Sequence, residues 1–354
     1  MSKKWLALAL KFLVSGLLIW VLFANIDLGE AKARLLQADP RMLALAVGVL
    51  VVQMFIAGLR WATVLKAMGT PLPLLKATQL FYIGVFFNQA LPSSVGGDAV
   101  RMYKAYREGL GLRGAINGVI LERVVVVLAL VGLVAATQPW FLPRVDEATR
   151  AVILPGIVLA AVGAGAGLAF LMLLDRLPEA LRRWRLIRGL GHLARDARKV
   201  FLRPGALIPA LAWGVATHVN VSLYAFVLAV SLDLDVTVFD CLTLIPPVML
   251  VMTVPISIAG WGVRETAMVV LFALIGVPKE GALVLSVLFG LVGMAFAIPG
   301  GAVWLASRDK GERVVALSPA MEGAADAPPD PTPGPTPAAD GGGGAEAGPP
   351  GRAN

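Results

Sequence analysis

The segment AVILPGIVLAAVGAGAGLAFLMLL, residues 151–174, contains no charged residue. A helix needs about 20 apolar residues to cross a bilayer core, so this segment is long enough to span a membrane. The composition agrees, because 58% of the 354 residues are hydrophobic and only 15% are charged. Soluble domains are usually about half apolar and a quarter charged. The sequence therefore predicts an all-α, polytopic integral membrane protein.

Further apolar runs extend this pattern along the chain. Six full spans are predicted, at about 5–23, 42–59, 115–137, 151–174, 207–232 and 282–305. The first span follows Lys3 and Lys4, and we expect it to be an uncleaved helix. Two more apolar stretches, 77–100 and 239–277, are interrupted by Pro and Gly. Residues 1–310 are thus the expected membrane domain. The Pro/Gly/Ala-rich residues 311–354 are expected to be a disordered tail.

Lysine and arginine are unevenly distributed between the two sides of these spans. If the N-terminus is cytoplasmic, 22 of them lie on the inside and 6 on the outside. This distribution follows the positive-inside rule and predicts a multi-pass cell-membrane protein with both termini in the cytoplasm. The net charge of +8 comes mostly from these connecting segments, which indicates anionic lipid and no nucleic acid. Segment 176–203 is either a basic amphipathic surface helix or an ordinary basic loop.

The two interrupted stretches contain similar motifs. The first is PSSVGGDAVR, residues 92–101, and the second is PISIAGWGVR, residues 255–264; five of the ten positions are identical. Proline breaks a helix and glycine permits a turn and close backbone approach. The expected helix breaks are Pro92, Gly96, Gly97, Pro255, Gly260 and Gly262.

The distribution of basic residues indicates from which side of the membrane each interrupted stretch enters. The first stretch has basic residues on both sides and is expected to enter from the cytoplasm and return there. The second is expected to enter and return on the outside. Two opposed re-entrant helical hairpins would make an inverted repeat of about 42–137 and 207–305, joined through segment 176–203. The alternatives are two unrelated kinks, or a first stretch that is a true span followed by a surface helix.

Charged residues within the apolar segments are candidates for a functional site, because charge inside a membrane is costly. Arginine binds phosphate through a planar fork of donors. We therefore expect a lipid headgroup phosphate to be bound by Arg101, Arg264 and Arg123, with Ser94 and Ser257 assisting. Three acidic residues, Glu122, Glu265 and Asp98, would carry a proton or pair with the arginines. The structural alternative is that these charges pair across helices and lock the fold.

A family resemblance follows from the same residues. Segment 88–101, the pair Glu122-Arg123 and segment 255–265 together resemble the lysylphosphatidylglycerol synthase transmembrane family, also called flippase-like, over roughly residues 5–310. The resemblance implies about eight hydrophobic segments and a role with lipids. In bifunctional members this domain is coupled to a cytoplasmic aminoacyltransferase and moves the product between leaflets. Here we expect no synthase activity, since only the short tail follows the last predicted span.

The expected function is that of a flippase or scramblase for an anionic or phosphate-bearing lipid or glycolipid. Its partners would be membrane lipids and, by association, lipid-synthesis enzymes. No phosphate-binding loop, metal-ligand spacing or cofactor motif is present, so we expect no cofactor, no metal and no ATP-driven step within the chain. Two alternatives are an intramembrane transferase that modifies lipids and a scaffold for a lipid-synthesis complex. The lipid and the oligomeric state stay open.

Overall fold

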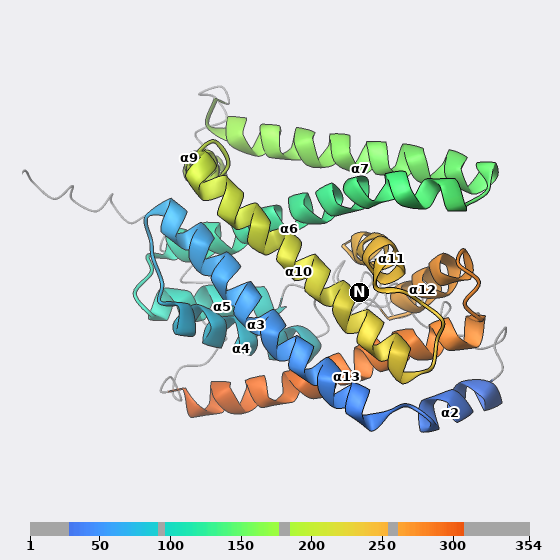
Figure 1. Ribbon diagram of the computed structural model, residues 1–354. Coiled ribbons are helices and arrows are strands. Elements are labelled where there is room, and N and C mark those ends of the chain that lie inside the picture. Colours follow the sequence, from blue (N-terminus) through green and yellow to red (C-terminus); the bar gives the residue numbers. More distant parts are fainter. Residues whose placement is uncertain (1–27, 91–95, 177–184, 254–260, 308–354) are drawn as a thin grey trace, which may run out of the picture. The chain divides into compact units, whose positions relative to one another are not determined.

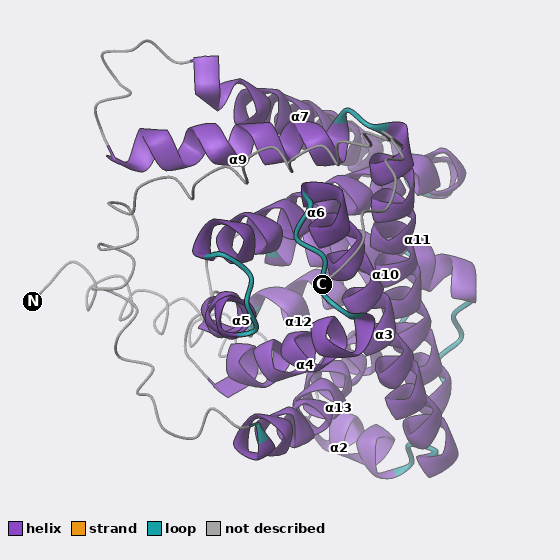
Figure 2. Cartoon of the chain, turned by 90° about the vertical axis from the view of Figure 1, so that its left-hand side faces the viewer, coloured by secondary structure: helices purple, strands orange, loops and turns teal. Residues whose placement is uncertain are grey.

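The computed structural model of the chain describes residues 28–90, 96–176, 185–253 and 261–307, and of residues 185–189 the backbone only. Within these ranges the secondary structure is helical, as predicted (Figure 2). The first predicted span, the predicted tail and five site residues lie outside the described residues: Pro92, Ser94, Pro255, Ser257 and Gly260.

In the part of the chain that the structure describes, five helices are long and apolar enough to cross a membrane. They are α3 (Pro40–Met68), α6 (Leu112–Phe141), α7 (Glu147–Leu173), α10 (Pro204–Ser231) and α13 (Lys279–Ala306). Each coincides with a predicted full span and extends beyond it at one or both ends. The length and apolar composition of these helices therefore agree with the predicted polytopic membrane protein.

Shorter helices connect or flank the long ones. The helical pair α4 (Leu74–Ala90) and α5 (Gly96–Arg107) covers the first interrupted stretch, and the pair α11 (Val238–Met252) and α12 (Val263–Ala273) covers the second. The other elements among the described residues are α2 (Leu28–Leu36), η1 (Leu142–Arg144), η2 (Leu174–Arg176) and α9 (Arg185–Phe201). A long helix, two short helices and a long helix thus occur twice, as α3–α6 and as α10–α13 (Figure 1).

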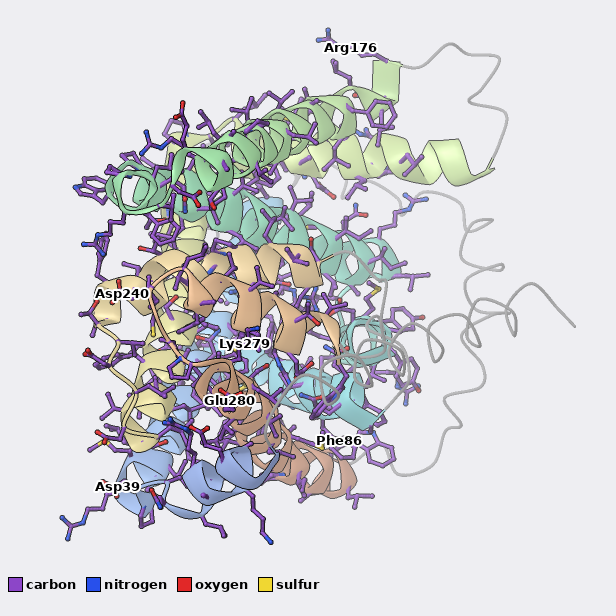
Figure 3. All side chains as sticks on the ribbon, turned by 90° about the vertical axis from the view of Figure 1, so that its right-hand side faces the viewer. Asp39, Phe86, Arg176, Asp240, Lys279 and Glu280 are labelled. Carbon is purple, nitrogen blue, oxygen red and sulfur yellow. The ribbon has the colours of Figure 1, made fainter. Side chains whose placement is uncertain are left out.

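Polar residues fix where several helices begin. The Asp39 carboxylate accepts a hydrogen bond from the backbone of Arg41, and Pro40 is the first residue of α3. At α11, Thr237 and Asp240 form a reciprocal capping box. Such caps satisfy donors that the first helical turn leaves without partners. Figure 3 shows Asp39 and Asp240 where these two helices begin.

Each of the two four-helix sets has a cluster of buried side chains, and a third cluster joins α3, α6, α9 and α10. Trp61, Leu65, Leu80 and Val119 belong to a cluster of buried side chains from α3 to α6. A second cluster is built mainly from α10 to α13, and the two sets meet where α3 packs along α10. Helix α7 contributes differently, because none of its residues is buried. It packs against α6 and α9 and otherwise exposes apolar side chains.

Helix α9 occupies residues 185–201 of segment 176–203, so this part of the segment is a helix and not a loop. One face of α9 is buried against neighbouring helices through Leu193, Ala197 and Val200. Arg198 anchors it, donating hydrogen bonds to both carboxylate oxygens of Asp175 and to the carbonyl of Met172. The helix is therefore an amphipathic one that packs on the protein itself.

Candidate functional site

The first helix pair is held together by direct backbone contact. A Cβ atom on Gly97 would lie 2.0 Å from the carbonyl oxygen of Gly84, so only glycine fits at this crossing of α4 and α5. The side-chain oxygen of Asn88 accepts a hydrogen bond from the backbone N–H of Gly97, at 2.9 Å. This bond satisfies a donor in the first turn of α5. The contact fixes the start of α5, from which Asp98 and Arg101 extend toward α6.

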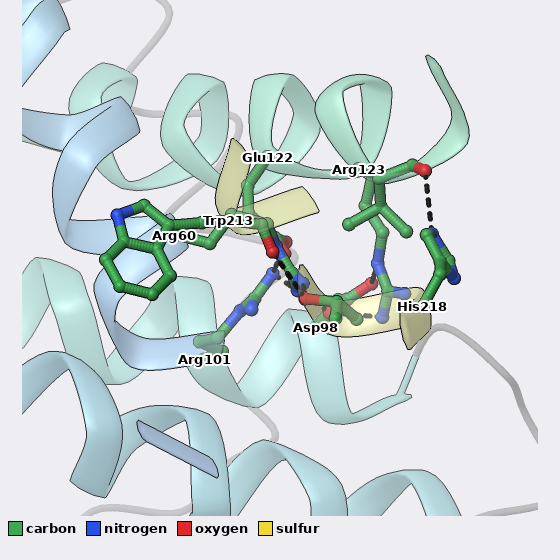
Figure 4. A network of polar contacts seen from close by, with 9 residues as sticks. Arg60, Asp98, Arg101, Glu122, Arg123, Trp213 and His218 are labelled. Carbon is green, nitrogen blue, oxygen red and sulfur yellow. Dashed lines mark hydrogen bonds and ion pairs between the residues drawn. The ribbon is translucent and has the colours of Figure 1, made fainter. Parts of the chain in front are cut away.

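Five charged side chains from three helices form one network, which we call the arginine–carboxylate network: Arg60, Asp98, Arg101, Glu122 and Arg123 (Figure 4). Glu122 accepts from Arg101 at 2.7 Å through one oxygen and from Arg60 at 2.8 Å through the other. Asp98 lies 3.3 Å from Arg101. Both oxygens of Asp98 accept from Arg123, at 2.8 and 3.0 Å. The charges therefore alternate in sign from α3 through α6 to α5 and back to α6.

Four of the five side chains are withdrawn from the surface. The exposed fractions of Arg101 and Glu122 are 2% and 1%, whereas 48% of the Arg123 side chain is exposed. The Arg101 guanidinium also lies 4.7 Å from the ring centres of both Trp61 and Phe81. Buried charges are tolerated when they are paired and hydrogen-bonded, and cation–π contacts add to this. Arg123 is the member of the network that an external group can reach.

A second, smaller cluster surrounds Arg264 near the start of α12. Its guanidinium donates to Glu265 at 2.6 Å and to the Ser286 hydroxyl of α13 at 3.1 Å. The Trp261 ring lies 5.0 Å away. A Cβ atom on Gly290 would lie 2.4 Å from the guanidinium, so this glycine makes room for the arginine.

Gly262, one of the glycines at the predicted breaks, lies directly before α12 and has a positive φ. Its φ of 84° lies in the left-handed region that favours glycine, and its N–H donates to the Glu265 carboxylate at 2.6 Å. Glu265 therefore both caps α12 and pairs with Arg264. Among the described residues, the partners of Arg264 and those of Arg101 are different, so the two arginines lie in separate clusters.

One member of the network, Arg60, is not among the predicted site residues. Arg60 was placed in a loop after a span that ends at residue 59; this boundary is wrong, because α3 continues to Met68 and Arg60 is 3% exposed. The signal was the apolar run Trp-Ala-Thr-Val-Leu at 61–65, which prolongs the helix. Arg60 also donates to the hydroxyl of Thr217 on α10, so the network reaches the second set of helices. Among the described residues no group of three or more His, Cys, Asp or Glu could hold a metal ion.

The fold and the site together define a class of protein: a multi-pass helical membrane protein with a charged network inside its helical domain. The comparison with protein families is more specific. Residues 8–301 match the family described as Lysylphosphatidylglycerol synthase TM region, and no other domain is found. The chain belongs to this family, which confirms the resemblance seen in the sequence. No curated protein matches the chain.

Proposed function

We propose that the protein is a flippase or scramblase that moves an anionic or phosphate-bearing lipid, or a glycolipid, between the leaflets of the cell membrane. The observation that carries this proposal is the repeated placement of a buried arginine. Arg101 follows the break between α4 and α5 and contacts Glu122, 21 residues later; Arg264 follows the break between α11 and α12 and contacts Ser286, 22 residues later. In both cases the partner lies on the next long helix.

This correspondence supports an inverted repeat. The two sets α3–α6 and α10–α13 have the same order of long and short helices. The lysine and arginine distribution assigns them opposite orientations, with both termini of the chain in the cytoplasm. Transporters built from such repeats bind their substrates near the membrane midplane, at discontinuous helices. On this proposal each short pair is a re-entrant hairpin and the lipid headgroup passes between states exposed to either leaflet.

The charges supply the chemistry of headgroup binding. Guanidinium groups bind phosphate oxygens in bidentate geometry. The acidic residues Glu122, Glu265 and Asp98 pair with the arginines, and a headgroup phosphate would compete with Glu122 and Glu265 for Arg101 and Arg264. The three carboxylates are also the places where a proton could be taken up or released. Movement of lipid would then be passive or coupled to protons.

The test is leaflet exchange in liposomes that contain the purified protein and fluorescent phosphatidylglycerol. Exchange faster than in protein-free liposomes is expected. Arg101→Lys and Arg264→Lys keep the charge but lose the planar fork, and each should slow exchange by about tenfold or more. Arg34→Lys, at an exposed pair with Glu30, is the matched control and should leave exchange unchanged.

Three outcomes would contradict the transport proposal. Absence of exchange for every phospholipid and glycolipid tested, with and without a proton gradient, would rule out the transport proposal. Formation of a modified lipid from a lipid-linked donor would instead favour an intramembrane transferase. Exchange that requires added lipid-synthesis enzymes would favour a scaffold.

A further inference from the structure

A groove lies beside the exposed end of the arginine–carboxylate network. It has a volume of about 540 Å³ and is lined by residues of α5, α6 and α7. Binding sites for small molecules and cofactors usually measure about 300–1,000 Å³, so the groove is large enough for part of a lipid. Two of its lining residues are charged, Asp98 and Arg123, and the others are Met, Val, Ile, Leu, Ala and Gly.

The shape of the groove depends on glycines of α7. Gly163 and Gly167 are one helical turn apart and both line it. A Cβ atom on either would have no neighbour within 4 Å, so both face open space. Helix α7 is a candidate span with no buried residue. Its glycine face therefore leaves the groove along α6 open to acyl chains of the bilayer.

The charge at the head of the groove is not balanced. The network holds three arginines and two carboxylates, a formal excess of one positive charge. Arg60 and Arg101 are buried among the other members, whereas Arg123 lines the groove. The hydrogen bonds of Arg123 to Asp98 use Nε and Nη2, and Nη1 makes no hydrogen bond to the described residues. An excess positive charge beside an apolar groove complements a ligand with one negative charge and a hydrocarbon tail.

We propose that this groove binds an anionic membrane lipid, with its phosphate on Arg123 and one acyl chain along Gly163 and Gly167. The site rests on the proposed function, since it gives the transported lipid a place to leave the bilayer. Asp98 is the positioning residue, because it accepts two hydrogen bonds that hold the Arg123 guanidinium at the head of the groove. Asp98 also lies 3.3 Å from Arg101, so the residue that binds the phosphate is linked to the buried part of the network.

The experiment measures lipid binding separately from exchange. Fluorescent phosphatidylglycerol is titrated into the detergent-purified full chain, with fluorescent phosphatidylcholine as the neutral comparison. The double variant Gly163→Leu/Gly167→Leu fills the groove and should weaken phosphatidylglycerol binding by about tenfold or more, because apolar contact area with the acyl chain is lost. Gly156→Leu is the matched control, since Gly156 lies on the same helix, also faces open space and does not line the groove. It should bind within about twofold of the unmodified protein.

A second variant tests the headgroup. Arg123→Gln should remove the preference for phosphatidylglycerol over phosphatidylcholine while the acyl chain still binds. Inorganic phosphate added in excess should not displace the lipid, because it has no acyl chain to occupy the apolar groove. Thermal unfolding of each variant confirms that the fold is intact.

The outcomes separate this proposal from the transport proposal. If the unmodified protein exchanges lipid and the filled groove neither weakens binding nor slows exchange, the groove site is wrong and transport stands. If lipid binds in the groove as described but no exchange occurs, the site stands and transport is wrong. Equal binding of phosphatidylglycerol and phosphatidylcholine by the unmodified protein would also overturn the role of Arg123.

Discussion

At the scale of single residues, Glu122 is a buried acidic residue whose charge depends on its partners. Its carboxylate is 1% exposed and accepts hydrogen bonds from two arginines on different helices. Removing one partner of a buried ion pair leaves an uncompensated charge in a medium of low dielectric constant. Glu122 therefore stabilises the fold first, whatever part it has in binding lipid.

Glu122→Gln should lower the free energy of unfolding by about 3–5 kcal/mol, the usual cost of breaking a buried pair. Denaturant titration in detergent measures this. Glu30→Gln, at an exposed pair with Arg34, should change stability by less than about 1 kcal/mol. The double variant Arg60→Gln/Glu122→Gln should cost less than the sum of the single changes, because the residues interact. Additive losses would show that Arg60 and Glu122 are not coupled.

At the scale of secondary-structure elements, glycines set the distance between helices. The contact of Gly97 with Gly84 brings the backbones of α4 and α5 together, and Gly290 makes room for Arg264 beside α13. Gly132 lies in α6, where an added Cβ would meet no atom within 4 Å. Glycine at Gly97 is thus required by packing, and glycine at Gly132 is not.

Gly97→Ala should destabilise the protein by about 1–3 kcal/mol, since the contact is with backbone and the helices must move apart. Gly132→Ala should stabilise it by up to about 1 kcal/mol, as expected for glycine within a helix. Thermal unfolding of the two variants compares them directly. Equal and favourable effects would mean that α4 and α5 do not cross at this glycine.

At the scale of the whole molecule, the proposed inverted repeat predicts which side of the membrane each connection faces. The beginning of α13 is expected outside and the end of α5 is expected in the cytoplasm. Lys279 and Tyr106 are exposed at these positions, and the native Cys241 is buried. Cysteine labelling can therefore be done with little background.

Lys279→Cys should react with a membrane-impermeant maleimide in intact cells. Tyr106→Cys should react only after the membrane is opened, because α5 is expected to end on the cytoplasmic side. Labelling of both positions from the same side would contradict the opposed hairpins. Labelling of Tyr106→Cys from outside would show that α4 is a true span, the alternative that the sequence left open.

The sequence by itself determined the class of protein and the position of five long helices. This is possible because a membrane span depends on local properties, its length and its apolar composition. The shared motif singled out Arg101 and Arg264, and the charge inside an apolar span singled out Glu122. The same residues indicated the family, which the family comparison confirms.

Only the tertiary structure decided how these charges are arranged. Glu122 pairs with Arg60, 62 residues earlier in the chain, and Arg101 and Arg264 lie in separate clusters. Arg123 differs from its neighbour Glu122 in exposure because adjacent residues on a helix point to different faces. Which face is buried depends on the helices packed against α6. The groove beside α7 likewise exists only in the folded chain, where Gly163 and Gly167 face open space.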